Sequence, residues 1–308
     1  MAIYYKIKKK KKGYFGMPKG MKNGAYIFCA VMMIPVVIGI IKYLYVNTQS
    51  ILLAFTDGEV FKDPFSLGNF RMLFMDLKDG GEVAVATINT FKYFAAGLIL
   101  QFLSYVVAYF LYKKIPGYGA FRLIFFLPCV IAPVITAMIF KQLIRPGGIV
   151  WNLCKNVFHK EYEDLLFYPE TATNTILVFT FLNGFGSAFL IFIGAMNRIP
   201  QEIIESANLD GCKAGKEFRH IILPLTWSTY SVFLLMSVAC VFTASGPILY
   251  LTNGGAKTYT IGFWIYSQVK GNAINYPAAI GVFFTLIGIP IVLLTRFLIN
   301  KLDSGVTY

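Results

Sequence analysis

The sequence predicts an all-α membrane protein with six transmembrane helices, and three observations lead to that prediction. Hydrophobic residues make up 57% of the 308 residues, and the mean hydropathy is +0.63. Only 14% of the residues are charged, whereas charged residues make up about a quarter of an ordinary soluble chain. The apolar residues are clustered into long runs, and an aromatic content of 17% suits a protein with rings at both membrane interfaces.

Each apolar run is close to the roughly 20 residues with which a helix crosses about 30 Å of hydrocarbon. A spanning segment must satisfy its own backbone hydrogen bonds, so a helix is the expected structure of each run. The six segments are residues 24–46, 91–112, 119–140, 174–196, 225–242 and 277–299. Three prolines are expected to kink the spans that contain them; they are Pro128, Pro133 and Pro290.

The distribution of basic residues predicts the orientation of these spans. Residues 1–23 form a tail with eight lysines, and no small-residue cleavage site follows the first apolar run. We therefore expect an uncleaved first helix with its amino terminus in the cytosol. In this orientation most of the 28 Lys and Arg residues fall in inner segments, as the positive-inside rule requires. Six spans then place the carboxyl terminus in the cytosol as well.

These features divide the chain into four parts. The Lys-rich tail (1–23) is followed by the first helix with its outer loop (24–84), a five-helix core (85–300) and a short cytosolic tail (301–308). The core contains one long inner loop, residues 197–224. A simple connection between helices needs only a few residues, so a loop of this length is expected to dock another protein.

This inner loop has the pattern of a helix, a turn and a second helix. Pro200 suits the first turn of a helix, and Glu205 follows in an early turn, where the helix dipole favours an acid. Gly211 can adopt the positive φ of a turn. A second helical stretch is expected over residues 213–220, and Pro224 is expected to open the fifth span.

The loop also resembles a known motif. Glu205-Ser206-Ala207, three residues, Gly211, nine residues and then Ile221-Ile222-Leu223-Pro224 are similar to the EAA loop of ABC importer permeases. Ser206 stands where the family usually has Ala. Ile199-Pro200 and Asp210-Gly211 are similar to the carbohydrate branch of the family, the maltose-type and multiple-sugar permeases. Weaker matches lie outside the loop, at Ala54-Phe55-Thr56-Asp57, Leu67-Gly68-Asn69-Phe70, Asn89-Thr90 and Thr252-Asn253-Gly254-Gly255-Ala256.

The resemblance implies a type I (MetI-like) importer permease in the plasma membrane of a prokaryote. The implied partners are a second permease subunit, a cytosolic ABC ATPase dimer, an extracytoplasmic solute-binding protein and the lipid bilayer. This chain would be a transport subunit that binds no cofactor, because ATP hydrolysis belongs to the ATPase. The ATPase-coupling residues would be Glu205, Ser206, Ala207, Asp210 and Gly211. The frame of the loop would be Pro200, Ile221, Leu223 and Pro224.

Other classes of site and function find less support. The two histidines, His159 and His220, fall in different loops, and the five cysteines form no CxxC pair, so no metal site is expected. Residues 211–216 have three residues between glycines, and Glu217 follows where a phosphate loop needs Ser or Thr. No soluble segment is large enough for nucleic-acid binding. An intramembrane enzyme would need paired acids, Ser/His or metal ligands within the spans, and these are missing.

The cargo of such a permease is expected to be a sugar or an oligosaccharide, with glycerol phosphate or a polyol as the alternative. A channel or secondary transporter is a further alternative, for which buried ionisable residues or half-helix repeats would be expected. Polar side chains within spans tend to face a cavity or another helix. The candidates for the substrate path are Asn183, Gln101 and Thr243, and a hydrogen bond between helices is the competing explanation for each.

Overall fold

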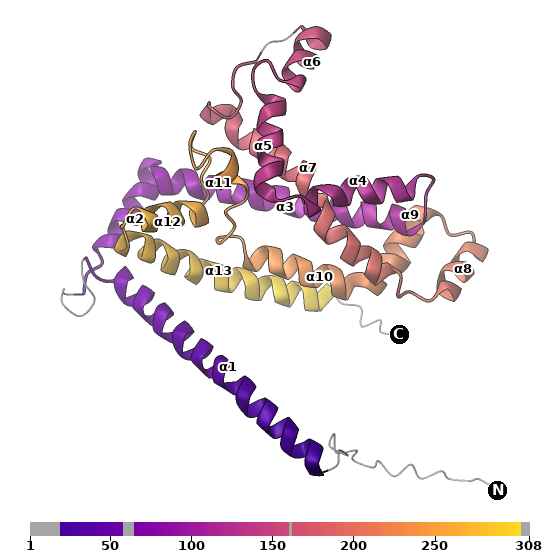
Figure 1. The fold of residues 1–308 in the computed structure, drawn as a ribbon, viewed down its shortest axis with the longest axis horizontal. Coiled ribbons are helices and arrows are strands. Elements are labelled where there is room, and N and C mark those ends of the chain that lie inside the picture. The colour runs from indigo at the N-terminus through magenta and orange to yellow at the C-terminus, as the bar shows by residue number, and fades with distance from the viewer. Residues whose placement is uncertain (1–18, 58–64, 160–161, 303–308) are drawn as a thin grey trace. The chain divides into compact units, whose positions relative to one another are not determined.

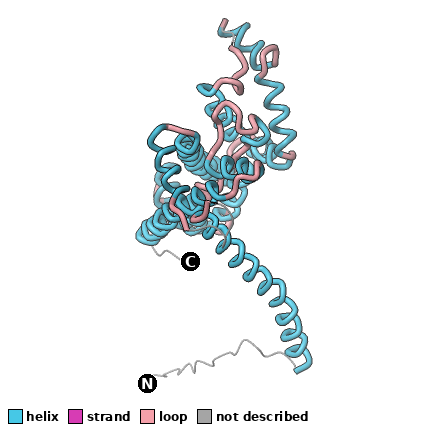
Figure 2. Tube along the Cα trace, turned by 90° about the vertical axis from the view of Figure 1, so that its left-hand side faces the viewer, coloured by secondary structure: helices cyan, strands magenta, loops and turns pink. Residues whose placement is uncertain are grey.

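The computed structural model describes residues 19–57, 65–159 and 162–302. All regular elements in these ranges are helices, apart from a single antiparallel bridge between Thr56 and Phe65 (Figure 2). The chain divides into two compact units, Met1–Leu52 and Leu53–Tyr308. The described part of the first unit consists of α1 (Lys19–Ala54), which ends just inside the second unit.

Helix α1 is longer than the apolar run that predicts it. Its 36 residues include the last five residues of the predicted tail and continue past residue 46. The stretch Tyr26–Ala54 is long and apolar enough to cross a membrane. Pro35 lies inside this helix, as prolines in membrane helices often do.

The second unit is built around four long helices. By length and composition, five helices of the whole described chain can cross a membrane, or six if one bent pair counts as a span. The four in the second unit are α3 (Glu82–Tyr112), α7 (Pro169–Met196), the continuous helix Ala214–Ala239 that ends in α10 (Leu223–Ala239), and α13 (Asn275–Leu302). Helix α7 packs along α3, and α10 packs along α13 (Figure 1).

The third apolar run does not form the single, kinked span that the sequence predicts. It forms α4 (Tyr118–Val130) and α5 (Pro133–Ile144), with a bend of 106° between α4 and the helical segment that begins at Pro133. Ile131 and Ala132 are extended, with ψ angles of 138° and 134°. A residue before proline is pushed out of the α conformation, so Pro133 causes a full break where only a kink was expected.

Beyond the break, α5 packs against α11 (Ile248–Leu251). Helix α6 (Ile149–Phe158) follows α5 in the chain. Helix α4 instead packs along α7. A Cβ atom at Gly186 of α7 would lie only 2.7 Å from the carbonyl oxygen of Phe125. The absence of a side chain at Gly186 therefore permits the close approach of α4 and α7.

Residues 53–57 and 65–81 belong to the second unit. Helix α2 (Gly68–Asp79) packs against both α3 and α13. The Asn69 side chain donates to the carbonyl oxygens of Ala54 and Thr56, at 3.3 and 3.0 Å. The Asp76 carboxylate accepts a 2.9 Å hydrogen bond from the Val83 amide in the first turn of α3. These bonds fix α2 beside the beginning of α3.

Candidate functional site

The long loop between α7 and α10 has the predicted order of helix, glycine turn and helix. Helix α8 spans Gln201–Leu209, with Pro200 directly before its first residue. Gly211 has a φ of +73°, and its amide donates to the carbonyl of Asn208. The amide of Cys212 donates to the carbonyl of Ala207 at 3.0 Å. This pair of hydrogen bonds around a left-handed glycine is the Schellman motif that ends many helices.

The exposed surface of α8 differs in one residue from the surface that the sequence predicts. Glu205, Ser206 and Asp210 are exposed. Ala207 is only 9% exposed and packs against its own chain, so it does not present a small face to a partner. Leu209, which the motif does not single out, is 89% exposed at the end of the helix.

The second half of the loop is directly continuous with a membrane span. Helix α9 (Ala214–Glu217), the π-helical turn η1 (Phe218–Ile222) and α10 form one uninterrupted helix, Ala214–Ala239. The expected start of a new helix at Pro224 is therefore wrong. A proline in an α-helix clashes with the carbonyl four residues earlier. The wider π turn, in which the Leu223 amide donates to the Phe218 carbonyl, lies directly before Pro224 and relieves this conflict.

A buried ion pair attaches this continuous helix to the end of α3. Glu217 is 1% exposed. The Nζ atom of Lys113, the residue that follows α3, lies 3.0 Å from its Oε1 atom and 2.9 Å from its Oε2 atom. The hydroxyl of Tyr109 donates to the carbonyl of Ala214 at 3.1 Å. These contacts fix α9 to α3, and a carboxylate this buried needs its cation.

Apolar packing reinforces the same junction. Ile222 is fully buried and belongs to a cluster that also contains Tyr105, Phe192 and Ile199. Of the predicted frame residues, Ile221, Leu223 and Pro224 are half-buried. Sequence reasoning assigned no contact to Lys113, Tyr109 or Glu217. Their partners lie about a hundred residues away in the chain, and no local pattern connects them.

The three predicted substrate-path residues make different hydrogen bonds. Asn183 donates to the carbonyl of Phe179 in its own helix at 3.0 Å. Gln101 is buried, and its carbonyl oxygen accepts a 2.8 Å hydrogen bond from Ser237, which joins α3 to α10. Thr243 is exposed and donates to the carbonyl of Cys240. Among the described residues, no group of three or more His, Cys, Asp and Glu side chains could hold a metal ion.

At the opposite end of α3, hydrogen bonds from Asn89 and Thr90 hold the loop before α12 (Ile261–Lys270). We call this set of hydrogen bonds the Asn89 latch. Asn89 donates to the carbonyls of Lys257 and Tyr259, at 2.7 and 3.1 Å. The hydroxyl of Thr90 accepts from the amide of Ile261 at 3.0 Å. The sequence singled out Asn89-Thr90 and residues 252–256 only by resemblance, and the structure joins Asn89 and Thr90 to the residues that directly follow that loop.

Charged and aromatic side chains surround this latch. The Trp264 indole donates to Glu82 at 2.8 Å. Burial, and next the carboxylates of Glu82 and Asp76, raise the pKa of the Tyr259 phenol above its ordinary value. The latch itself is formed by the Asn89 amide, the Thr90 hydroxyl and backbone groups, none of which is charged.

Comparison with known proteins identifies clear relatives. The family model for the binding-protein-dependent transport system inner membrane component matches residues 102–308. The multiple sugar-binding transport system permease protein MsmF of Streptococcus mutans is 25% identical over 272 residues, which cover 85% of this chain and 91% of that protein. The sn-glycerol-3-phosphate transport system permease protein UgpA of Rhizobium meliloti is 24% identical over 199 residues, covering 64% of this chain and 67% of UgpA.

A solved structure has the same fold. It is the crystal structure of a bacterial alginate ABC transporter in complex with an alginate pentasaccharide-bound periplasmic protein. One of its chains matches with a TM-score of 0.76 at 21% sequence identity, and the match covers 94% of this chain and 99% of that chain.

Proposed function

This chain belongs to the family of inner membrane components of binding-protein-dependent transport systems, and from that premise we propose that it is the permease subunit of an ATP-driven sugar importer. Two relatives support a carbohydrate cargo. The name of MsmF refers to multiple sugars, and the structural neighbour is an alginate transporter. UgpA, named for sn-glycerol-3-phosphate, makes glycerol phosphate the second candidate.

The observation that carries this proposal is the connection of the exposed helix α8, through a short turn, to the continuous helix Ala214–Ala239. Glu205 and Leu209 are exposed on α8, and we assign them to docking in a cleft of an ABC ATPase. The Gly211 turn connects α8 to the continuous helix Ala214–Ala239, which enters the membrane without a break. A push on α8 is therefore transmitted to α10 as a rigid-body movement.

The Lys113–Glu217 ion pair also couples movement of the α8 loop to α3. Because Glu217 lies in the continuous helix and Lys113 follows α3, movement of the loop also pulls on α3. Helix α3 packs along α7, so both of these spans would move together with the loop. The translocation pathway lies between this subunit and a second permease subunit. Closure of the ATPase dimer would in this way change the side of the membrane to which that pathway is open.

The predicted orientation places both the α8 loop and the ATPase in the cytosol. The opposite end of α3, with the Asn89 latch, then faces the solute-binding protein. The complex of the structural neighbour with a periplasmic protein supports a partner of this kind. ATP hydrolysis is assigned to the ATPase, and this chain transmits its closure.

Docking can be tested in the reconstituted complex with its co-encoded partners. We expect the double variant Glu205→Lys/Leu209→Asp to lose co-purification with the ATPase and cargo-stimulated ATP hydrolysis, while the thermal stability of the permease is unchanged. Lys270→Ala, at an exposed position in α12, is the matched control and should behave as wild type. Unchanged cargo-stimulated hydrolysis in the double variant would refute the docking proposal.

The cargo class needs a separate measurement. The co-encoded solute-binding protein should bind a member of a panel of mono- and oligosaccharides, and uptake of the same sugar should depend on this permease. Binding and uptake of sn-glycerol 3-phosphate in place of every sugar would favour the second candidate. It would leave the docking proposal intact.

A further inference from the structure

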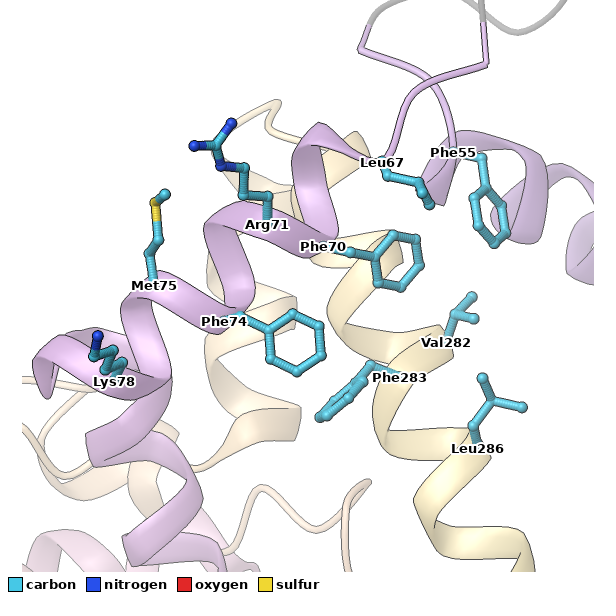
Figure 3. A pocket seen from close by; sticks show the side chains of 10 residues that line it. All are labelled: Phe55, Leu67, Phe70, Arg71, Phe74, Met75, Lys78, Val282, Phe283 and Leu286. Atoms are coloured by element: carbon cyan, nitrogen blue, oxygen red, sulfur yellow. The ribbon is translucent and has the colours of Figure 1, made fainter.

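An apolar groove is lined by residues of α2 and of the first half of α13. Both helices lie beside the beginning of α3, at the opposite end of that helix from α8 (Figure 1). The volume of the groove is about 670 Å³. Eight of the ten side chains that line it are apolar, and the other two are the cations Arg71 and Lys78. The eight apolar residues are Phe55, Leu67, Phe70, Phe74, Met75, Val282, Phe283 and Leu286 (Figure 3).

The three faces of α2 explain this composition. Leu73 points into the protein core and is fully buried. Phe70 and Phe74, one turn apart, point toward α13, where the ring of Phe74 meets that of Phe283 edge-on at 5.5 Å (Figure 3). Arg71 and Lys78 are seven residues apart, so they lie two turns apart on nearly the same side of the helix. The helix therefore carries an aromatic face and, next to it, a cationic face.

The position of the groove along α13 places its apolar wall within the membrane. Helix α13 has 28 residues, which is about 42 Å at about 1.5 Å per residue and exceeds the hydrocarbon thickness of about 30 Å. If the excess is shared between both ends, Val282, Phe283 and Leu286 lie below the interface. Side chains at this depth that are not covered by protein face acyl chains, and Leu286 is 63% exposed.

Within the described ranges, neither Arg71 nor Lys78 forms a salt bridge with a carboxylate. The nearby carboxylate of Asp76 lies on another side of α2 and accepts from the Val83 amide. An apolar groove with two unpaired cations along its rim matches an amphiphile with an acyl chain and an anionic headgroup.

We propose that this groove binds an anionic phospholipid of the surrounding bilayer. One acyl chain lies between the rings of α2 and the side chains of α13. The phosphate lies at Arg71, whose planar guanidinium can donate two hydrogen bonds to it, and Lys78 supplies a second positive charge. An apolar helix from another part of the assembly would fill the groove but leave both cations without an anion. The inference does not depend on the cargo or on the ATPase.

A photo-crosslinker identifies the occupant directly. Leu286→p-benzoylphenylalanine, in the complete complex in native membranes, should yield on illumination an adduct of the permease with the mass of a phospholipid. A crosslink to residues 19–54 or to a second permease subunit would show that a protein helix covers the groove and would overturn the proposal.

Selectivity for the anionic headgroup is tested by native mass spectrometry of the detergent-solubilised complex. The complex is mixed with phosphatidylglycerol and phosphatidylcholine of equal chain length. Wild type should retain phosphatidylglycerol preferentially, and Arg71→Gln/Lys78→Gln should reduce that preference about tenfold. The control Lys257→Gln/Lys270→Gln removes the same charge from exposed positions at the same end of α3. An equal effect in both double variants, or none in either, would overturn the assignment of the headgroup to Arg71 and Lys78.

Discussion

The Nζ atom of Lys113 lies within hydrogen-bond distance of both carboxylate oxygens of Glu217, at 3.0 and 2.9 Å. The side chain of Glu217 is 2% exposed and that of Lys113 is 30% exposed. The pair connects residues 104 positions apart and makes the end of α3 and the helix Ala214–Ala239 move together. Loss of the cation alone costs more free energy than loss of both charges, because it leaves a buried carboxylate without a partner.

Lys113→Met should therefore be more harmful than loss of both charges. We expect it to lower the free energy of unfolding by about 3 kcal/mol, and Lys113→Met/Glu217→Met should recover most of that loss. Thermal unfolding in detergent measures both effects. Lys114→Met, at an exposed neighbouring position, is the control and should be neutral. A double variant as unstable as the single one would show that packing outweighs the charge.

Gly211→Ala should weaken the turn after α8 through the backbone alone. No heavy atom lies within 4 Å of a Cβ atom at this position, yet φ is +73°. An L-residue in this conformation costs about 1 kcal/mol, and Asn should cost less than Ala. We expect reduced stability and reduced coupling of ATP hydrolysis to transport.

Gly215→Ala is the matched control for that substitution. Gly215 lies in α9 with equal space around it and no positive φ, so the substitution should stabilise the helix by about 0.5–1 kcal/mol. Equal effects at the two positions would contradict the role of the left-handed turn.

Asn89→Leu should release the loop before α12. It removes two part-buried hydrogen bonds to the carbonyls of Lys257 and Tyr259, each of which contributes about 0.5–1.5 kcal/mol. Hydrogen exchange at residues 257–261 should become faster. Thr87→Val, which loses only a bond to Val83 within its own helix, should leave the exchange of this loop unchanged. Unaltered protection in Asn89→Leu would show that the loop is held by other contacts.

Gly186→Ala should push α4 away from α7. The new methyl group would meet the Phe125 carbonyl at 2.7 Å, and overpacking of this kind costs about 1–3 kcal/mol. A lower melting temperature in detergent measures the effect. Gly194→Ala in the same helix has nothing within 4 Å and should be tolerated. Equal tolerance at both positions would contradict the close approach of the two helices.

The sequence by itself determined the helical membrane class, the apolar runs and the helix–turn–helix pattern of the α8 loop. These features rest on hydropathy and on local backbone preference, as at Gly211, and both are properties of neighbouring residues. The same local information predicted a kink at Pro133 but not a bend of 106°, because the angle depends on what α5 packs against.

The tertiary structure alone decided which side chains of the α8 loop are exposed and which pack within the chain. Ala207 belongs to a motif associated with docking, yet it is covered by its own chain, while the neighbouring Leu209 is exposed. Glu217 could be read from sequence only as a residue unsuited to a phosphate loop, and its role emerged when folding brought Lys113 against it. Burial and long-range pairing arise from packing between distant segments, and no local pattern of residues encodes them.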